Sequence, residues 1–177
     1  MGTDKSLLKY HQLPQRYHLY GMLQALCEKV FISCNATQVE GMDPSFHIIP
    51  DLTEYAQCGP ISGLLSAFSM FPGKDLLVTG CDYPFISYEE MERFYASVMP
   101  GVLAAAFYDE RSQHYEPLLG FYAAASAPLL KEQFTEEQYS IQYFLQRRHA
   151  QTYIPVSPNT MLGVNTMEEY EAARLLL

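Results

Sequence analysis

Short apolar segments alternate with amphipathic segments along most of the chain, and no other sequence feature limits the fold as strongly. Apolar, β-rich runs predict strands at residues 29–35, 46–51, 75–82, 101–107, 114–126 and 151–156. Helical spacing or helix-start residues predict helices at residues 14–28, 60–71, 87–98, 135–149 and 165–177, with a further short helix near 127–134. Strands that alternate with helices and form continuous apolar runs are typical of a mostly parallel sheet covered on both faces. The pattern therefore predicts an α/β fold.

Several predicted helices begin with residues that favour a first turn. Pro60 is a good first helical residue, and Ser87 is followed shortly by two acidic residues. Thr135 is predicted to cap the helix over 135–149, whose last turn is basic. These residues set the expected helix boundaries.

Size and composition predict one globular domain over residues 1–177, because the sequence shows no repeat, low-complexity tract or linker. Hydrophobic residues make up 49% and charged residues 18%, which excludes global disorder. The longest apolar runs are far shorter than the roughly 18 residues of a membrane span. With 11 Lys and Arg against 20 Asp and Glu, the net charge is -9. That excess of acid argues against a nucleic-acid or membrane partner.

The four cysteines, Cys27, Cys34, Cys58 and Cys81, form no C-x-x-C pair and no Cys/His cluster with zinc spacing. They flank or lie in apolar runs, so we expect reduced thiols that pack as small hydrophobic groups. The first ten residues lack the apolar core of a secretion signal. Both observations predict a cytoplasmic protein.

Polar residues follow the predicted strands, where ligands bind in open α/β sheets. Asp82 ends the strand over 75–82, and a carboxylate there is suited to Mg²⁺; the alternative is a cap on the following turn. Asp51 follows the predicted strand over 46–51, and the alternative for it is a loop residue or a helix cap. Asn35 follows the predicted strand over 29–35, and the alternative for it is a turn residue.

Gly59, Pro60 and Gly63 surround the start of a predicted helix, where backbone N–H groups favour anions and glycines allow close approach. The signal is weak by itself, since Gly-Pro helix starts are common. Lys5, taken alone, is a solvated terminal charge. The five histidines show no i, i+4 pair, so no catalytic histidine is predicted.

The order of these features resembles the molybdenum cofactor guanylyltransferases. The resemblance rests on MGTDKS at the start, the strand ending in Asn35, Asp51, GPISGLLSAF, VTGCDYPFIS, EPLLGFY and VNTMEEY, and covers nearly the whole chain. These enzymes belong to the nucleotide-diphospho-sugar transferase-like superfamily. The resemblance therefore implies a three-layer α/β/α, Rossmann-like fold.

The resemblance implies transfer of GMP from GTP to the phosphate of molybdopterin, with release of pyrophosphate. In this family Lys5 would match the lysine that neutralises the triphosphate, and Asp82 would match the Mg²⁺-binding aspartate. Asn35 and Asp51 would match positions that contact the guanosine. The Gly59-Pro60 turn fits the guanine-handling members better than the cytidylyl relatives.

The sequence starts within the family's N-terminal signature, whose earlier part is a first strand and a glycine-rich loop with an arginine. Three explanations for the missing part of the signature are open: a misplaced start, a shortened chain, or a diverged, non-catalytic descendant. Without a central first strand, we expect the strands within 29–34 and 75–80 to close together, to take a strand from a second copy as a homodimer, or to leave 29–34 displaced or poorly ordered. A cytidylyl or sugar-phosphate nucleotidyltransferase, and a non-catalytic interaction module, are the alternative functions.

Overall fold

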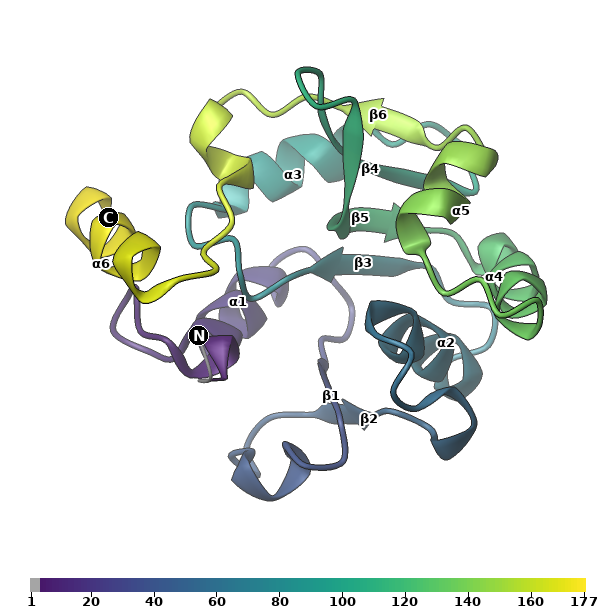
Figure 1. The fold of residues 1–177 in the computed structure, drawn as a ribbon, viewed down its shortest axis with the longest axis horizontal. Coiled ribbons are helices and arrows are strands. Elements are labelled where there is room, and N and C mark those ends of the chain that lie inside the picture. The colour runs from purple at the N-terminus through teal and green to yellow at the C-terminus, as the bar shows by residue number, and fades with distance from the viewer. Residues whose placement is uncertain (1–3) are drawn as a thin grey trace.

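A computed structural model describes residues 4–177 (Figure 1). The strands are β1 (Ile32–Cys34), β2 (Ile48–Pro50), β3 (Leu76–Thr79), β4 (Ala104–Asp109), β5 (His114–Tyr122) and β6 (Gln151–Tyr153). The α-helices are α1 (Gln15–Leu23), α2 (Pro60–Met70), α3 (Tyr88–Ser97), α4 (Ala127–Thr135), α5 (Ile141–Arg147) and α6 (Met167–Leu176). Each predicted strand overlaps an observed one, and β4 extends two residues beyond the predicted range 101–107. Within residues 4–177, no helix has both the length and the apolar character needed to span a membrane.

The predicted helix over 135–149 is wrong at its start. Thr135 ends α4, and α5 begins after Ser140, whose hydroxyl accepts a hydrogen bond from the Tyr143 backbone N–H. The buried amide of Gln133 donates to the carbonyls of Gln138 and Ser140, both at 3.0 Å. These bonds hold the intervening residues in a turn, so local sequence signals for a helix start are overridden by a buried side chain.

The larger sheet has the strand order β3-β5-β4-β6, and helices cover both of its faces (Figure 1). β5 runs antiparallel to β3 and β4, whereas β4 and β6 are parallel, so the sheet is mixed. On one face α1 and α3 pack through Leu19 and Phe94 onto a core that includes Phe107. On the other face α2, α4 and α5 pack around Leu130 and Tyr122. The α/β/α layers are confirmed.

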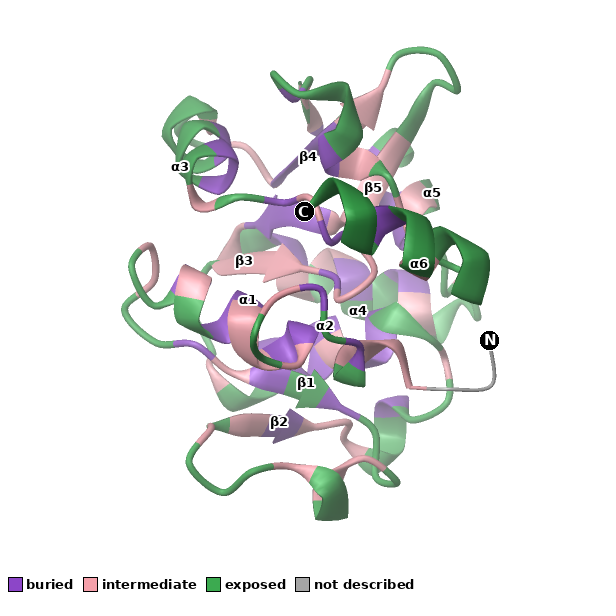
Figure 2. Ribbon diagram, turned by 90° about the vertical axis from the view of Figure 1, so that its left-hand side faces the viewer, coloured by how far each residue is buried: buried purple, intermediate pink, exposed green. Residues whose placement is uncertain are grey.

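β1 and β2 form a separate two-stranded parallel sheet, and β1, β2 and β3 run in the same direction (Figure 2). Ile32 and Cys34 bond to the β2 segment, so the N–H and C=O groups of Ser33 point away from it, toward β3. The Gly80 N–H donates a hydrogen bond to the Leu118 carbonyl of β5. Because successive residues of a strand direct their N–H and C=O groups to opposite sides, those of Thr79 point toward β1. The two facing edges are unpaired with each other.

The expected closure of β1 onto β3 is therefore wrong for residues 4–177, since the two strands belong to different sheets. The contact between β1 and α2 explains why. A Cβ added to Gly63 of α2 would lie 2.5 Å from Ser33 Oγ, so β1 already sits as close to α2 as a side chain allows. Residues 4–12 contain a 3₁₀ helix and no strand. Filling of the gap by a second copy stays a prediction.

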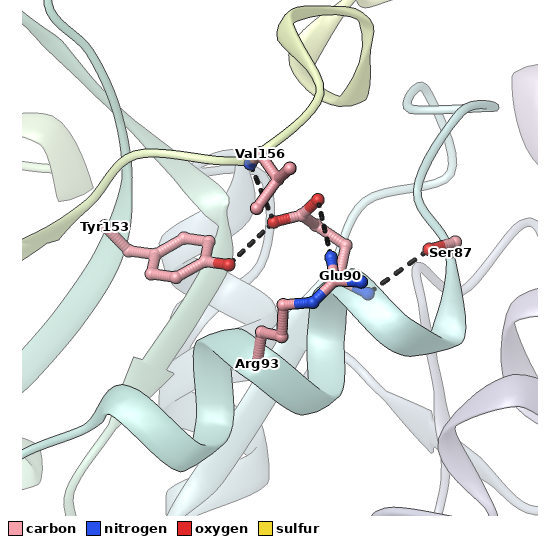
Figure 3. Close-up of polar contacts among 5 residues, drawn as sticks. All are labelled: Ser87, Glu90, Arg93, Tyr153 and Val156. Atoms are coloured by element: carbon pink, nitrogen blue, oxygen red, sulfur yellow. Dashed lines mark hydrogen bonds and ion pairs between the residues drawn. The ribbon is translucent and has the colours of Figure 1, made fainter.

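A buried carboxylate joins α3 to the segment after β6 (Figure 3). Glu90 is only 3% exposed, although it is an acidic residue in the first turn of α3. Its Oε1 accepts hydrogen bonds from Tyr153 Oη at 2.6 Å and from the Val156 backbone N–H at 3.1 Å. Arg93 lies 3.6 Å from the other oxygen, and the Glu90 N–H donates to Ser87 Oγ, which confirms Ser87 as the cap.

Replacing Gly59 with alanine is expected to lower the free energy of unfolding by about 1–3 kcal/mol, the usual range for a strained backbone position. Gly59 has φ 77° and ψ −153°, a conformation that essentially only glycine adopts. Urea denaturation measures the effect. Gly21→Ala, on the exposed side of α1, is the matched control and is expected to raise stability by about 0.5–1 kcal/mol. If both variants lost the same free energy of unfolding, the claim that the backbone at Gly59 requires glycine would be contradicted.

Candidate functional site

A cleft of about 1110 Å³ lies between the edges of β1 and β3. Four of the predicted residues line it: Asn35, Asp51, Gly59 and Pro60. A smaller cavity of about 260 Å³ is lined by the other two, Lys5 and Asp82. The two cavities adjoin, because both are lined by Ile32, Ser33, Gln38 and Cys81. The structure thus gathers all six predicted residues at the carboxyl ends of β1, β2 and β3.

Asp82 follows β3 and is partly buried. Its backbone carbonyl accepts a hydrogen bond from the Val164 N–H at 2.9 Å. Its carboxylate has no hydrogen-bond donor among residues 4–177, so the alternative of a turn cap has no support there. A Cβ at Gly80 would lie 2.7 Å from Asp82 Oδ1, so glycine at position 80 leaves room for the carboxylate.

The donor set around Asp82 fits Mg²⁺ in one particular mode. Within the described part of the chain, no three His, Cys, Asp or Glu residues are grouped to hold a metal by themselves. Mg²⁺ is commonly held by one or two carboxylates together with waters and substrate phosphates. A single unpaired carboxylate that lines the smaller cavity fits that mode and does not fit a structural metal centre.

Lys5 is anchored rather than free at the terminus. Its Nζ donates to Asn165 Oδ1 at 2.6 Å, from a segment 160 positions away. The turn at Asn165 is fixed by the capping box of α6, in which Thr166 and Glu169 exchange hydrogen bonds. Leu8 belongs to a small buried cluster that includes residues of the C-terminal segment. The sequence analysis missed this contact of Asn165 with Lys5, although the VNTMEEY motif contains Asn165.

Asn35 stabilises the turn after β1, which is the alternative role considered for it from the sequence. Its Oδ1 accepts hydrogen bonds from the Thr37 and Gln38 backbone N–H groups at 3.0 and 3.2 Å. The side chain of Asp51 has no hydrogen-bond partner among residues 4–177, and burial raises the pKa of its carboxyl. A carboxylate that is partly desolvated without compensation is unfavourable for stability, which favours a ligand-directed role for Asp51.

The loop before α2 is held rigidly, and this fixes Gly59 and Pro60. Ser62 Oγ donates to the Tyr55 carbonyl and accepts from the Cys58 N–H. No atom lies within 4 Å of the position a Gly59 Cβ would take, so the backbone there faces open space. The start of α2 is therefore accessible from the cleft.

The four thiols are free, and three of them, Cys27, Cys34 and Cys81, line the cleft. Burial raises the pKa of the Cys81 thiol to about 12, and burial also raises the pKa of Cys34. Both are neutral thiols at physiological pH. They lack the thiolate character that a nucleophilic cysteine needs.

Arg16 is the second residue that the sequence analysis missed. It lies in the first turn of α1, is only 4% exposed and lines the cleft. A signal for its burial exists, since positions 16, 19, 20 and 23 share one helical face, and Leu19, Tyr20 and Leu23 are buried.

Comparison with known proteins matches the MobA-like NTP transferase domain family to residues 1–152 of the chain. The chain belongs to this family. It is therefore of the nucleotidyltransferase type.

Two relatives are named for molybdenum cofactor biosynthesis. The molybdenum cofactor biosynthesis bifunctional protein of Synechocystis is 29% identical over 175 residues, 96% of this chain and 49% of its own length, so the chain spans about half of it. A molybdenum cofactor guanylyltransferase of Shewanella halifaxensis is 26% identical over 95% of this chain and 84% of its own length.

Two solved structures share the fold. The molybdopterin-guanine dinucleotide biosynthesis protein A of Archaeoglobus fulgidus has a TM-score of 0.80 at 19% identity, covering 99% of this chain and 91% of its own. A CMP:2-keto-3-deoxy-manno-octonic acid synthetase complexed with CTP has a TM-score of 0.72 at 14% identity, covering 97% and 90%. At these identities the likeness establishes the fold, and the α/β nucleotidyltransferase fold is confirmed.

Proposed function

We propose that this protein transfers GMP from GTP to the phosphate of molybdopterin and releases pyrophosphate. The observation that supports this most strongly is the gathering of all six predicted site residues around two adjoining cavities. Membership of the MobA-like NTP transferase domain family and the relatives named as guanylyltransferases point to the same reaction.

The chemistry needs few protein groups. An oxygen of the pterin phosphate attacks the α-phosphorus of GTP, the bond from that phosphorus to the bridging oxygen breaks, and pyrophosphate takes the electron pair. The attacking phosphate is already an anion, so no general base is required. The protein has to align two anions and stabilise the charge that develops on the phosphates.

In this proposal Lys5 and Asp82, at the smaller cavity, serve the phosphates. Lys5 neutralises triphosphate charge, and its hydrogen bond to Asn165 fixes the position of the ammonium group. Asp82 holds Mg²⁺, which supplies further charge neutralisation at the phosphates. Both residues line the same cavity, which supports a common role.

The larger cleft receives the nucleoside. Asn35 keeps its amide nitrogen available, because the turn uses only its oxygen. Asp51 offers an unpaired carboxylate, and Gly59 with Pro60 leaves open space at the start of α2. A carboxylate accepts hydrogen bonds, so Asp51 suits N–H or O–H donors of guanosine.

A cytidylyltransferase is the second candidate, because the CTP-bound synthetase shares the fold over 97% of this chain. Calorimetric titration with GTP and CTP, each with Mg²⁺, separates the two. We expect GTP to bind at least tenfold more tightly. Tighter binding of CTP would support the second candidate, and binding of neither would support a non-catalytic interaction module.

The cellular setting follows from the same proposal. We expect the reaction to take place in the cytoplasm, in keeping with four free cysteines. Association of two copies through the gap between β1 and β3 stays a prediction, which sedimentation velocity would test.

A further inference from the structure

Arg16 is a buried cation without a matching anion. No carboxylate of residues 4–177 forms an ion pair with it, although its side chain is only 4% exposed. Nη2 donates to the Gly41 carbonyl at 2.9 Å and to Tyr17 Oη at 3.0 Å. Nε is buried and has no hydrogen-bond partner. The guanidinium therefore keeps unused donors next to the cleft.

Such an arrangement is costly for a structural residue. Buried charges in proteins are normally paired, because an uncompensated charge loses its hydration. Methionine would fill a similar volume on the buried face of α1 without that cost. A buried arginine that has no ion pair and lines a cleft is therefore better explained by a ligand that supplies the missing negative charge.

The neighbours of Arg16 place its charge near the predicted phosphate region. Arg16 lines the larger cleft together with Ser33 and Cys81, and these two residues also line the smaller cavity that contains Lys5 and Asp82. Despite partial burial, hydrogen bonds from Ser6 and Gln38, together with the charge of Arg16, hold the pKa of Asp4 below its ordinary value. Arg16 thus lies close to the carboxyl ends of β1 and β3 and to the residue before Lys5.

We propose that Arg16 is a phosphate-binding residue of the cleft, whose guanidinium takes the phosphate groups of the bound nucleotide. This inference rests on the proposed function and assigns a second cation, besides Lys5, to the triphosphate. Guanidinium suits this task because it stays protonated and presents several donors to phosphate oxygens.

Titration of inorganic triphosphate and of GTP, each with Mg²⁺, into wild type and Arg16→Met tests the proposal. We expect affinity for both probes to fall about 10- to 100-fold, the usual effect of losing a charge-assisted hydrogen bond. Arg16→Lys keeps the charge and is expected to lose less than Arg16→Met. Arg111→Met removes an equal charge from an exposed turn and is expected to bind like wild type.

Thermal unfolding of the same variants separates binding from a structural role. Removing an unpaired buried charge is expected to leave the midpoint of Arg16→Met unchanged or raised. A lowered midpoint with unchanged affinity would overturn the inference in favour of a structural role. If wild type binds GTP and Arg16→Met binds it equally well, only the inference about Arg16 fails. If wild type binds neither probe, the proposed function fails with it.

Discussion

Replacing Asp82 with asparagine is expected to lower the rate of GMP transfer by about 100- to 1000-fold. Losing a group that stabilises developing charge commonly has an effect of this size. The asparagine keeps the volume of the side chain and removes its charge. Since no donor among residues 4–177 bonds to the Asp82 carboxylate, folding is expected to change little. A large kinetic effect with a small stability effect is therefore the expected signature.

The measurement is pyrophosphate release at saturating GTP and molybdopterin over a range of Mg²⁺ concentrations. Glu110→Gln, an equal charge change in the exposed turn between β4 and β5, is the control and is expected to match wild type. If Asp82→Asn keeps both the wild-type rate and the wild-type Mg²⁺ dependence, Asp82 is not the metal-binding residue.

Replacing Glu90 with leucine is expected to lower the free energy of unfolding by about 2–4 kcal/mol, since an unsatisfied buried donor costs about 1–3 kcal/mol. The substitution deprives Tyr153 Oη and the Val156 N–H of their common acceptor (Figure 3). Arg93, which pairs with Glu90, has a side chain that is 53% exposed. Loss of this ion pair therefore adds little to the decrease in the free energy of unfolding.

Urea denaturation of Glu90→Leu and Glu90→Gln measures this effect. Glutamine keeps one acceptor oxygen, so we expect a smaller loss. Glu92→Leu lies on the exposed part of the same helix and is expected to stay within about 0.5 kcal/mol of wild type. Equal stabilities for Glu90→Leu and Glu92→Leu would show that the buried network contributes nothing.

The sequence was sufficient for features that depend on local pattern. The strands ending near Asn35, Asp51 and Asp82 were predicted because apolar runs followed by polar residues are a local signal. Once those strands are nearly parallel neighbours, their carboxyl ends lie at one edge, and the polar residues come together there. The helix over 165–177 was predicted for the same reason, since the residues that cap the start of α6 are close together in sequence.

Features that depend on distant contacts were not predictable in this way. Lys5 meets Asn165 across 160 positions, and no local pattern links them. The antiparallel direction of β5 depends on its neighbours in the sheet rather than on its own composition. The turn between α4 and α5 depends on the buried amide of Gln133. Arg16 was missed because one arginine in an amphipathic helix is ordinarily exposed.

The gap between β1 and β3 has a consequence for the site. The cleft lies between two unpaired strand edges, so its shape depends on how firmly β1 and β2 are held by α2. Hydrogen exchange of the backbone N–H groups of Ser33 and Thr79 would report directly on the state of these edges. A second copy bound there would slow both.

The most direct test is incubation of the protein with molybdopterin, Mg²⁺ and GTP labelled at the α-phosphate, followed by mass spectrometry of the pterin product. We expect the label in a guanine dinucleotide form of molybdopterin, with one pyrophosphate released for each molecule formed. Absence of label in the pterin product with GTP, together with transfer from CTP or with no transfer at all, would contradict the proposed guanylyltransferase function.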